Sequence, residues 1–287
     1  MRSWMAQEAY SLSLLKIEFG PLKLFYLRYF VDKMNAPKIT VVKIGGHVID
    51  DDQALNSFLK EFSAISGLKV LIHGGGKVAT TIAKQIGIPQ TMIEGRRVTD
   101  AETLKVITMV YGGLVNKKIV ASLQSLGIPS LGVTGADSDL IRSKKRSTIP
   151  IDYGFVGDVE KVNFSALDHW ISQGLVPVVA PLTHDGQGQI LNTNADSIAT
   201  AIAVSLSQKY EVTLFYAFEK KGVLMDVSDE STAIPEMNFE FYQKLRAEKK
   251  IFEGMIPKLD NAFLSIRSGV TQVIIGKNSE NGTRITQ

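Results

Sequence analysis

From Lys38 onward the chain alternates short apolar runs, glycine turns and stretches with helical spacing. Residues 39–44 form the first run, which Gly45 and Gly46 follow; residues 68–73 form the second, which three glycines follow. Runs of β-branched residues that end in such turns and lead into helices are typical of parallel sheets with helical crossovers. The alternation therefore predicts an α/β fold with three layers, an αβα sandwich around a mainly parallel central sheet.

The same periodicities predict the positions of the other elements. Further strands are expected at residues 130–133, 176–180, 212–218 and 270–275. Helices are expected at residues 53–65 and 78–86, the second ending at Gly87 and Pro89. Another helix should run through residues 259–268, with Pro257 in its first turn.

The length of the chain predicts more than one core. A chain of 287 residues exceeds the size at which one compact core is usual, so two lobes of roughly 100 to 150 residues are expected. Turn-forming residues gather at 181–189, between a buried strand and a helix, and this is the expected hinge. We therefore divide the chain into an N-terminal extension (1–37) and two lobes (38–183 and 184–287).

Composition argues against several classes of partner and chemistry. With 45% hydrophobic and 21% charged residues the chain is typical of globular proteins, and its formal net charge of +3 is too small to indicate nucleic-acid binding. The densest basic cluster, residues 142–146, is short. The absence of cysteine excludes disulfides, thiolate nucleophiles and cysteine metal sites, and it fits the reducing cytoplasm.

The first 33 residues mix aromatic and leucine side chains with charges. Glu8, Lys16, Glu18 and Lys23 interrupt the apolar runs before any reaches membrane-spanning length, so neither a transmembrane helix nor a secretory signal is expected. Two interpretations of this segment stay open. Residues 22–34 form an amphipathic helix that docks on another subunit, or Met34 is the true start and the upstream residues are loosely structured.

The two glycine turns are candidate anion sites. A helix N-terminus presents unpaired N–H groups and a partial positive charge, and glycine lets an anion approach the backbone. Lys43 precedes the first turn and could meet a phosphate there, although a solvated lysine at a strand end fits the local sequence equally well.

Other chemistries that use glycine-rich turns lack their remaining parts. His73 and the three glycines after it resemble a hydrolase oxyanion hole, but the chain has no G-x-S-x-G motif to supply the nucleophile. It also has no Walker loop and no G-x-G-x-x-G dinucleotide fingerprint. Any phosphate binding must therefore use another geometry.

Five short motifs occur in a characteristic order and spacing along residues 38–287. They are Val42-Lys43-Ile44-Gly45-Gly46, His73-Gly74-Gly75-Gly76, Gly95-Arg96-Arg97-Val98-Thr99, Asn192-Thr193-Asn194-Ala195-Asp196 and Gly254-Met255-Ile256-Pro257-Lys258. Each motif is weak alone, but together they resemble the N-acetylglutamate kinase family of the amino-acid kinase superfamily. The resemblance implies the amino-acid kinase fold, with a first lobe that holds the acylated amino acid and a second lobe that holds ATP.

The resemblance also implies the reaction: ATP-dependent phosphorylation of the side-chain carboxylate of N-acetylglutamate or N-succinylglutamate, a step of arginine biosynthesis. A carboxylate is already ionised at neutral pH, so its attack on the γ-phosphoryl group needs no general base. By the resemblance, Lys43 and Lys258 are the catalytic lysines, and Asp196 fixes both ammonium groups. Mg²⁺ is expected to bridge the phosphates of ATP, with no metal site of the protein itself.

Binding roles follow from the same resemblance. The residues assigned to ATP are Lys43, Gly45, Gly46 and Lys258. The residues assigned to the acylated substrate are Gly75, Gly76, Arg97 and Asn192. A guanidinium such as that of Arg97 suits a bidentate grip on the α-carboxylate. From the local sequence alone, Asp196 could instead cap its helix, Asn192 could be a turn residue, and Lys258 could lie on the surface.

Two features depart from the family pattern. Residues 218–224 read F-E-K-K-G-V-L where related kinases commonly carry a T-D or S-D pair, so the nucleotide contact there stays open. Arg96 stands where many members have an apolar residue. It is either solvated or binds the second carboxylate of a succinyl group, which would make N-succinylglutamate the preferred substrate. Because adjacent strand residues point to opposite faces, Arg96 and Arg97 can share a ligand only if this segment is irregular.

Two rival functions stay open. Another amino-acid kinase, acting on glutamate, aspartate or carbamate, would share much of the pattern. A silent amino-acid-binding regulator would share the fold, but it has no need of Lys43, Asp196 and Lys258 together. The expected partners are small-molecule substrates and a second copy of the chain in a homodimer, with no nucleic acid and no membrane, in the cytoplasm.

Overall fold

The computed structural model describes residues 36–93 and 95–287. Lys38–Gln287 form one compact unit, which contains all five motifs. The helix considered at residues 22–34 lies outside the described residues. The division of the unit into lobes between residues 183 and 184 stays a prediction.

A central sheet of eight strands runs through this unit, in the order β12-β14-β13-β11-β1-β2-β8-β5. Its strands are β1 (Lys38–Ile44), β2 (Leu68–His73), β5 (Ser130–Val133), β8 (Val176–Val179), β11 (Glu211–Ala217), β12 (Glu236–Met237), β13 (Gln272–Gly276) and β14 (Thr283–Ile285). Every neighbouring pair is parallel except β13 and β14. The predicted mainly parallel sheet is confirmed.

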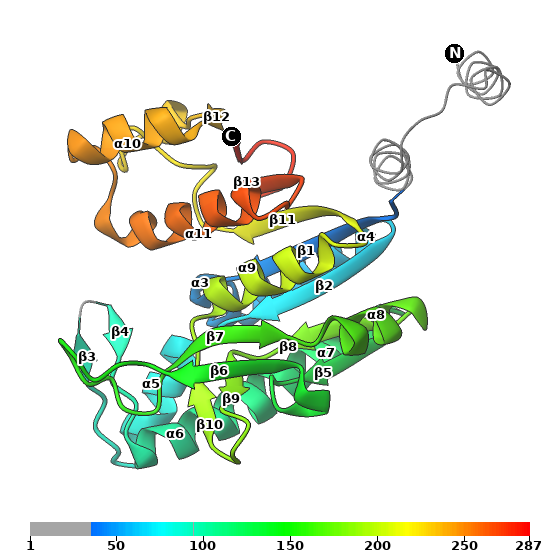
Figure 1. Ribbon diagram of the computed structural model, residues 1–287, viewed down its shortest axis with the longest axis vertical. Coiled ribbons are helices and arrows are strands. Elements are labelled where there is room, and N and C mark those ends of the chain that lie inside the picture. Colours follow the sequence, from blue (N-terminus) through cyan, green and yellow to red (C-terminus); the bar gives the residue numbers. More distant parts are fainter. Residues whose placement is uncertain (1–35, 94) are drawn as a thin grey trace, which may run out of the picture. The chain divides into compact units, whose positions relative to one another are not determined.

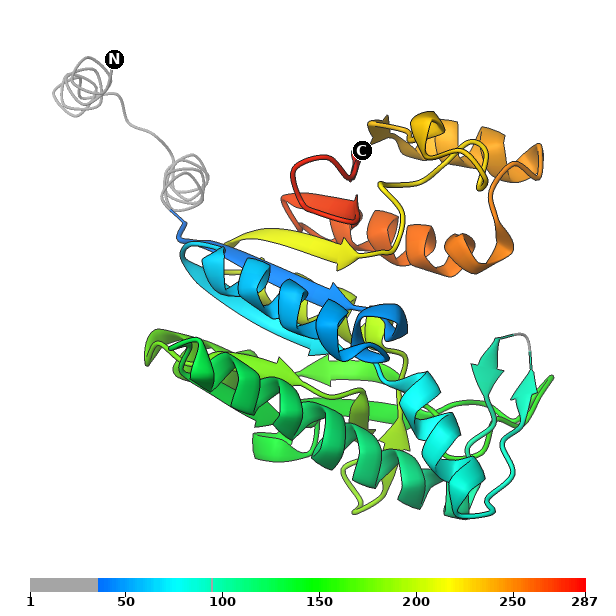
Figure 2. The same cartoon turned by 180° about the vertical axis from the view of Figure 1, so that it is seen from behind.

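Helices cover both faces of this sheet (Figure 1). One face carries α3 (Gly46–Ile49), α4 (Asp52–Ala64), α5 (Gly76–Gln85) and a continuous helix built of α6 (Ala101–Ile107), the π-helical η1 (Thr108–Val115) and α7 (Asn116–Ser125). Figure 2 shows α4 and this continuous helix from their own side. The opposite face carries α8 (Phe164–Ser172), α9 (Ala195–Leu206), α10 (Phe239–Ala247) and α11 (Ile256–Arg267). The three predicted layers are therefore present.

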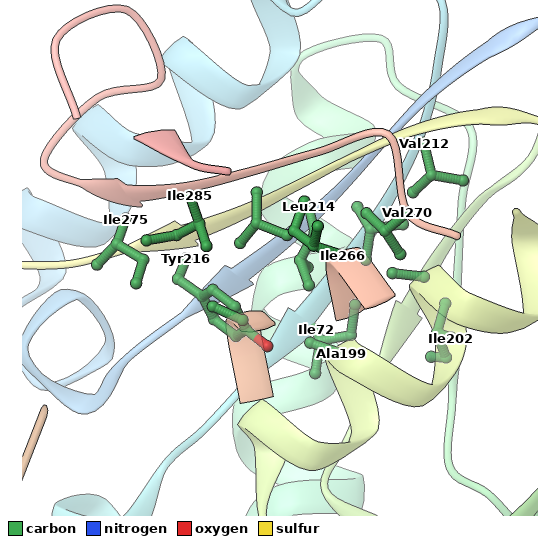
Figure 3. Close-up of a cluster of buried hydrophobic side chains, with 14 of the residues drawn as sticks. Ile72, Ala199, Ile202, Val212, Leu214, Tyr216, Ile266, Val270, Ile275 and Ile285 are labelled. Carbon is green, nitrogen blue, oxygen red and sulfur yellow. The ribbon is translucent and has the colours of Figure 1, made fainter. Parts of the chain in front are cut away.

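Apolar strands sit between these helical layers because both faces of the sheet are buried. In β1, Ile39 and Val41 pack in the core on the side of α9 and α11, whereas Val42 and Ile44 pack on the side of α4. Figure 3 shows part of the first core, in which Ile72, Leu214 and Ile275 of three strands meet Ile202 of α9 and Ile266 of α11. This alternation turns the side chain of Lys43 toward the face that α9 and α11 cover.

The continuous helix Ala101–Ser125 is long and apolar enough to cross a membrane by length and composition alone. Its buried residues explain that composition differently. Val106, Ile107, Ile119 and Leu123 are fully buried in the core on the α4 side of the sheet. We therefore assign its apolar character to packing within the fold.

A second, four-stranded sheet was not anticipated from the sequence. Its order is β10 (Ile190–Asn192), β9 (Leu182–His184), β6 (Ile141–Lys145) and β7 (Gly157–Val162). These strands are short or carry many charges, so they lack the apolar runs that marked the central strands. The hinge expected at residues 181–189 is a hairpin in this sheet, where Asp185 accepts hydrogen bonds from the backbone N–H groups of Gln187 and Gln189. Movement there stays a prediction.

The parallel strands β1, β2 and β11 end at the same edge of the central sheet. Lys43 is the last residue but one of β1, and His73 and Ala217 end β2 and β11. Strand β1 has β2 on one side and the much later β11 on the other, so the strand order reverses there. In open α/β sheets ligands bind at this kind of position.

Candidate active site

Three charged side chains meet at this edge. Lys43 Nζ lies 2.8 Å from Asp196 Oδ1, and Lys258 Nζ lies 2.9 Å from Asp196 Oδ2. The three side chains come from β1, the first turn of α9 and the first turn of α11, and none is more than 16% exposed. The structure therefore brings together the three residues that the sequence predicted to be catalytic. Their roles in a reaction stay a prediction.

Local sequence explains why Asp196 is available to both lysines. Asn194 is the N-cap of α9, and its Oδ1 accepts hydrogen bonds from the backbone N–H groups of Asp196 (2.7 Å) and Ser197 (3.2 Å). Because Asn194 caps the helix, the carboxylate of Asp196 is not used as a cap. Pro257 occupies the start of α11, where its missing N–H has no intrahelical partner to lose, and Lys258 follows in the same turn.

Burial and ion pairing shift the pKa values of Asp196 and Lys258 in opposite directions. Burial alone would raise the pKa of Asp196, but the ammonium groups of Lys43 and Lys258 outweigh it and hold that pKa well below its usual value. For Lys258, burial lowers the pKa, the carboxylate of Asp196 opposes that change, and the charge of Lys43 adds to it. The cluster carries two cations against one anion, so it has an excess positive charge to offer an anionic ligand.

The two glycine turns begin helices beside this cluster. Gly45 is the N-cap of α3 and Gly75 is the N-cap of α5. Glycine has no side chain with which to cap a helix, so the backbone N–H groups of the first turns are left for another acceptor. Gly75 adopts φ +143°, and a Cβ atom there would lie 3.2 Å from the ring of Tyr111. Position 75 therefore requires glycine for both its backbone and its surroundings.

Arg97 lies over the start of α5, and its predicted contact with the substrate carboxylate stays a prediction. Its Nη2 donates to the carbonyl oxygen of Gly76 (2.8 Å) and to Thr80 Oγ1 (2.9 Å), and its Nη1 donates to Gln90 Oε1. The residue is only 8% exposed. These contacts use three of the five N–H groups of the guanidinium, including both on Nη2. Arg97 and the glycine turn thus form one region, next to Tyr111, whose hydroxyl pKa burial raises and the charge of Arg97 lowers in part.

Asn192 connects two of the sequence motifs. Its Nδ2 donates to Thr99 Oγ1 (3.0 Å), which belongs to the same motif as Arg97. The backbone N–H of Asn192 donates to the carbonyl oxygen of Phe155. The residue is half-buried. Asn192 is therefore a link between β10 and the segment that carries Arg97, and substrate contact by its amide stays a prediction.

Arg96 does not share the surroundings of Arg97. The two residues form the short strand β4 (Arg96–Arg97), which pairs antiparallel with β3 (Met92–Ile93). Because the backbone is extended, the two side chains point to opposite faces, and Arg96 is exposed while Arg97 is buried. The irregular segment that would let both arginines hold one ligand is not present. A preference for N-succinylglutamate through Arg96 thus has no support from this geometry.

Residues 218–224 begin where β11 ends. The backbone N–H of Phe218 donates to the carbonyl oxygen of Gly276 of β13, and the side chain packs against the core on the side of α9. Gly222 lies against Thr283, whose Oγ1 accepts from the N–H of Val223 (2.8 Å) and donates to the carbonyl of Ile234 (2.6 Å). Thr283 thus connects residues 218–224, the segment that departs from the family pattern, to β14.

Sequence reasoning missed several residues that support the site. His73 ends the predicted strand at residues 68–73, and its buried ring accepts a hydrogen bond from Asn116 Nδ2 at Nε2 and donates from Nδ1 to the carbonyl oxygen of Gly74. Tyr216 was counted only as part of a strand, yet its ring lies beside Lys258 Nζ. The contacts of His73 with Asn116 and of Tyr216 with Lys258 leave no signal in the sequence, because each joins elements far apart in the chain.

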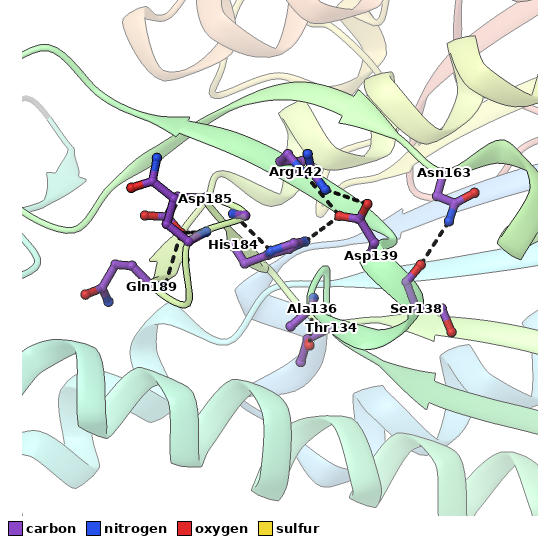
Figure 4. A network of polar contacts seen from close by, with 11 residues as sticks. Thr134, Ala136, Ser138, Asp139, Arg142, Asn163, His184, Asp185 and Gln189 are labelled. Atoms are coloured by element: carbon purple, nitrogen blue, oxygen red, sulfur yellow. Dashed lines mark hydrogen bonds and ion pairs between the residues drawn. The ribbon is translucent and has the colours of Figure 1, made fainter.

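A second polar cluster lies at the smaller sheet (Figure 4). His184 Nε2 lies 2.9 Å from Asp139 Oδ1, and Arg142 Nη2 donates to Asp139 Oδ2 (2.8 Å). His184 Nδ1 accepts from the N–H of Gly186. His184 and Asp185 lie in the segment 181–189, where turn-forming residues were noted, and Asp185 stabilises the turn there. The contact of His184 with Asp139 joins this turn to the segment just before β6.

The described residues, 36–93 and 95–287, include no group of three or more His, Cys, Asp or Glu side chains that could hold a metal ion. Both oxygens of Asp196 are already paired with ammonium groups. This donor set suits a Mg²⁺ ion that arrives on nucleotide phosphates, which is how proteins commonly bind Mg²⁺.

A parallel sheet whose carboxyl edge carries two glycine-started helices and a Lys–Asp–Lys cluster is suited to holding phosphoryl groups. The model of the amino acid kinase family matches residues 38–277, and the chain belongs to this family. The predicted superfamily and fold class are confirmed.

Individual relatives show which members of the family are similar to this chain. The acetylglutamate kinase of Bacteroides fragilis is 55% identical over 252 residues, which cover 86% of this chain and 97% of that protein. The acetylglutamate kinase of Bacteroides thetaiotaomicron is 56% identical, with 86% of this chain and 98% of that protein covered. The crystal structure of smu.665 from Streptococcus mutans superposes with a TM-score of 0.73 at 28% identity and covers 86% of this chain and 98% of that one. The predicted resemblance to N-acetylglutamate kinases agrees with the names of these relatives.

Proposed function

We propose that this chain transfers the γ-phosphoryl group of ATP to the side-chain carboxylate of N-acetylglutamate, giving ADP and N-acetylglutamyl 5-phosphate in arginine biosynthesis. The observation that carries the proposal is the cluster in which Asp196 pairs with Lys43 at 2.8 Å and with Lys258 at 2.9 Å. The acetylglutamate kinases of two Bacteroides species, more than half identical to this chain, support the choice of substrate.

The proposed chemistry needs positioning and positive charge. The substrate carboxylate attacks the γ-phosphorus, the bond from that phosphorus to the β,γ-bridging oxygen breaks, and that oxygen leaves with ADP. Negative charge accumulates around the moving group, so cations held on either side lower the barrier. Lys43 and Lys258 are these cations. Asp196 is a positioning residue that holds the two ammonium groups on either side of one carboxylate.

Each ligand has a set of proposed contacts. The backbone N–H groups at Gly45 and Gly46 bind nucleotide phosphates together with the two lysines, and Mg²⁺ bound to ATP neutralises the phosphate oxygens. Gly75, Gly76 and Arg97 bind the acylated amino acid, because the guanidinium of Arg97 is held at the start of α5 through its Nη2, beside the glycine turn. Asn192 borders the same region through Thr99. In this proposal residues 38–183 bind mainly the substrate and residues 184–287 mainly ATP.

One assay tests the function directly. Purified protein is mixed with ATP, Mg²⁺ and, in separate reactions, N-acetylglutamate, N-succinylglutamate, glutamate, aspartate or carbamate, and ADP release is measured. Trapping with hydroxylamine shows whether the product is an acyl phosphate. The proposal predicts the highest kcat/KM with N-acetylglutamate. A higher value with another acceptor identifies a different amino-acid kinase, and binding of an amino acid without ADP release identifies a silent regulator.

A homodimer is the proposed assembly. Met109 and Leu114 lie on η1 with 59% and 52% of their surface exposed, and large exposed apolar side chains on one element are typical of contact surfaces. Light scattering should give twice the mass of the chain, and the double variant Met109→Glu, Leu114→Glu should give the mass of one chain. An unchanged dimer in that variant would locate the contact elsewhere. The cytoplasmic location stays a prediction from the lack of cysteine.

A further inference from the structure

Tyr216 is a buried aromatic residue beside the charged cluster. It lies on β11 directly opposite Lys43 of β1, in a parallel pairing. Its side chain belongs to the core on the side of α9 and α11, the face toward which Lys43 also points. Figure 3 shows Tyr216 among the apolar side chains of that core. Its hydroxyl oxygen is its only polar side-chain atom. The side chain is fully buried.

Two different contacts join Tyr216 to the cluster. The Nζ atom of Lys258 lies 4.9 Å from the centre of the ring, within the range of a cation–π contact. The hydroxyl group is 2.7 Å from Thr200 Oγ1 and donates to the backbone carbonyl oxygen of Asp196 at 3.4 Å. One side chain therefore touches both members of the pair between Lys258 and Asp196.

We infer that Tyr216 is a positioning residue for the proposed phosphoryl transfer, whose ring holds the ammonium group of Lys258 while its hydroxyl group fixes the first turn of α9 at Asp196. This inference rests on the proposed function for its kinetic consequences. The geometry on which it depends does not, because the contacts exist without any substrate.

The ring is needed because Lys258 is a buried cation in an unfavourable setting. Burial lowers the pKa of Lys258, and the charge of Lys43 lowers it further, while the carboxylate of Asp196 works in the opposite direction. The negative face of an aromatic ring also favours the protonated form. Tyr216 itself does not ionise in the working range, because burial and then the charge of Asp196 raise its hydroxyl pKa far above the usual value.

These contacts give the ring and the hydroxyl separable effects. Removing the ring should leave a larger fraction of Lys258 neutral at alkaline pH. The fall of kcat at alkaline pH, which we call the alkaline limb of the pH profile, should therefore move to lower pH. Removing the hydroxyl alone should loosen the first turn of α9 but leave the ring in place. The groups that face Lys258 Nζ and take part in this balance are Asp196 of α9, Lys43 of β1 and Tyr216 of β11.

A matched control is available in the same core. Tyr242 of α10 is also fully buried, its hydroxyl donates to Asp260 Oδ1 (2.7 Å), and the guanidinium carbon of Arg246 lies 6.0 Å from its ring centre. It therefore has the same kinds of contact as Tyr216 but none with the three charged residues. Tyr242→Leu should destabilise the fold to a similar degree and leave kcat and its pH profile unchanged.

The kinetic test compares Tyr216→Leu, Tyr216→Phe and Tyr242→Leu. For Tyr216→Leu we expect kcat to fall roughly tenfold, the alkaline limb to move by about half a pH unit or more, and both KM values to stay within about threefold. For Tyr216→Phe we expect a loss of about threefold or less, with the limb in place. If Tyr216→Leu matches Tyr242→Leu in kcat and pH profile, Tyr216 only fills the core and the inference is overturned.

A second set of variants covers the case in which Tyr216→Leu does not fold. Tyr216→Phe can be made with one, two or three ring fluorines, which weaken the negative face of the ring at nearly constant shape. The alkaline limb should then move stepwise to lower pH with each fluorine. A limb that stays constant across the series removes the ring from the mechanism, because a residue that only packs has no reason to respond to ring electronics.

A direct titration separates this inference from the proposed function. The pKa of Lys258 can be followed by the ¹³C shift of its Cε, assigned by comparison with Lys258→Arg, in protein without substrates. It should be lower in Tyr216→Leu, or in the fluorinated series, than in wild type. An equal pKa in all of them would overturn the inference. If the titration gives the expected order but the wild type releases no ADP with N-acetylglutamate, only the proposed function fails.

Discussion

At the scale of single residues, the site depends on charges that would be unfavourable if they were separated. Asp196 is buried, and it stays ionised because two ammonium groups lie within 3 Å of its oxygens. Removing either lysine leaves one buried carboxylate oxygen of Asp196 without its ammonium partner. Effects on turnover must therefore be compared with effects on stability.

Lys43→Ala and Lys258→Ala should each raise the barrier to phosphoryl transfer by about 2–4 kcal/mol, because each removes a cation beside the moving group. The measurement is kcat with saturating ATP and N-acetylglutamate, alongside the free energy of unfolding in urea. Lys69→Ala is the matched control. Lys69 is also buried, but its Nζ donates to the carbonyl oxygens of Phe62, Ser63 and Ile65 at the end of α4.

The control should lose stability and keep its turnover. A folded Lys258→Ala protein with a turnover near that of wild type would remove Lys258 from the mechanism.

Arg97→Ala should raise the KM for N-acetylglutamate by roughly 10- to 100-fold and leave the KM for ATP nearly unchanged, as expected for the loss of a charge-assisted contact of about 1.5–3 kcal/mol. Its neighbour supplies the control, since Arg96 is exposed on the other face of β4. Arg96→Ala should change neither KM. An effect of Arg97→Ala that is confined to ATP would place this residue on the nucleotide side.

At the scale of elements, the N-cap of α9 does two things at once. Asn194 satisfies the N–H groups of Asp196 and Ser197, and it thereby sets the first turn from which the carboxylate of Asp196 projects. Asn238 caps α10 in the same way, through the N–H of Phe241, but α10 carries no residue of the site.

Asn194→Ala and Asn238→Ala should therefore each reduce the free energy of unfolding by about 1 kcal/mol. Only Asn194→Ala should also reduce kcat, because only α9 carries a member of the charged cluster. Urea unfolding and steady-state kinetics on both variants test this. Equal kcat in the two proteins would mean that the cap does not control the position of Asp196.

At the scale of the whole molecule, the buried ring of His73 makes folding stability depend on pH. Burial lowers its pKa to about 4; the hydrogen bond to Gly74 raises it in part, and the charge of Lys117 lowers it. In the unfolded chain a histidine has a pKa of about 6.5. Between these values the unfolded chain binds a proton that the folded protein does not, so this contribution is complete above pH 6.5 and is lost as pH falls toward 4.

The expected loss between pH 7 and pH 5 is about 2 kcal/mol, from 1.36 kcal/mol per pH unit. Urea unfolding of wild type and His73→Gln at both pH values isolates it, since the contributions of other groups cancel when the two proteins are compared. The variant should lose about 2 kcal/mol less than wild type. An equal loss in both would mean that His73 is protonated in the folded protein.

Strands and glycine turns could be predicted from the sequence because their causes are local. The predicted strand at residues 130–133 matches β5, and the runs at 39–44 and 68–73 match β1 and β2 to within one residue. Helices cover both faces of these strands. Because both faces are buried, successive side chains are apolar and the sequence shows a continuous apolar run. The smaller sheet escaped prediction because β6 and β7 are rich in charged residues, most of them exposed, and so lack the apolar runs that marked the central strands.

The sequence by itself determined the parallel α/β class, the two glycine-started helices and, through its five motifs, which residues belong together. Only the tertiary structure decided that Arg96 and Arg97 face opposite ways, and it gave the distances at which Asp196 meets the two lysines, whose pairing the motifs had implied. It also showed that Tyr216 lies between Lys258 and the first turn of α9. The physical reason is the distance along the chain over which each kind of interaction acts. Backbone preferences and apolar periodicity act over a few residues, whereas the direction and partner of a buried charge depend on segments that meet only when the sheet is assembled.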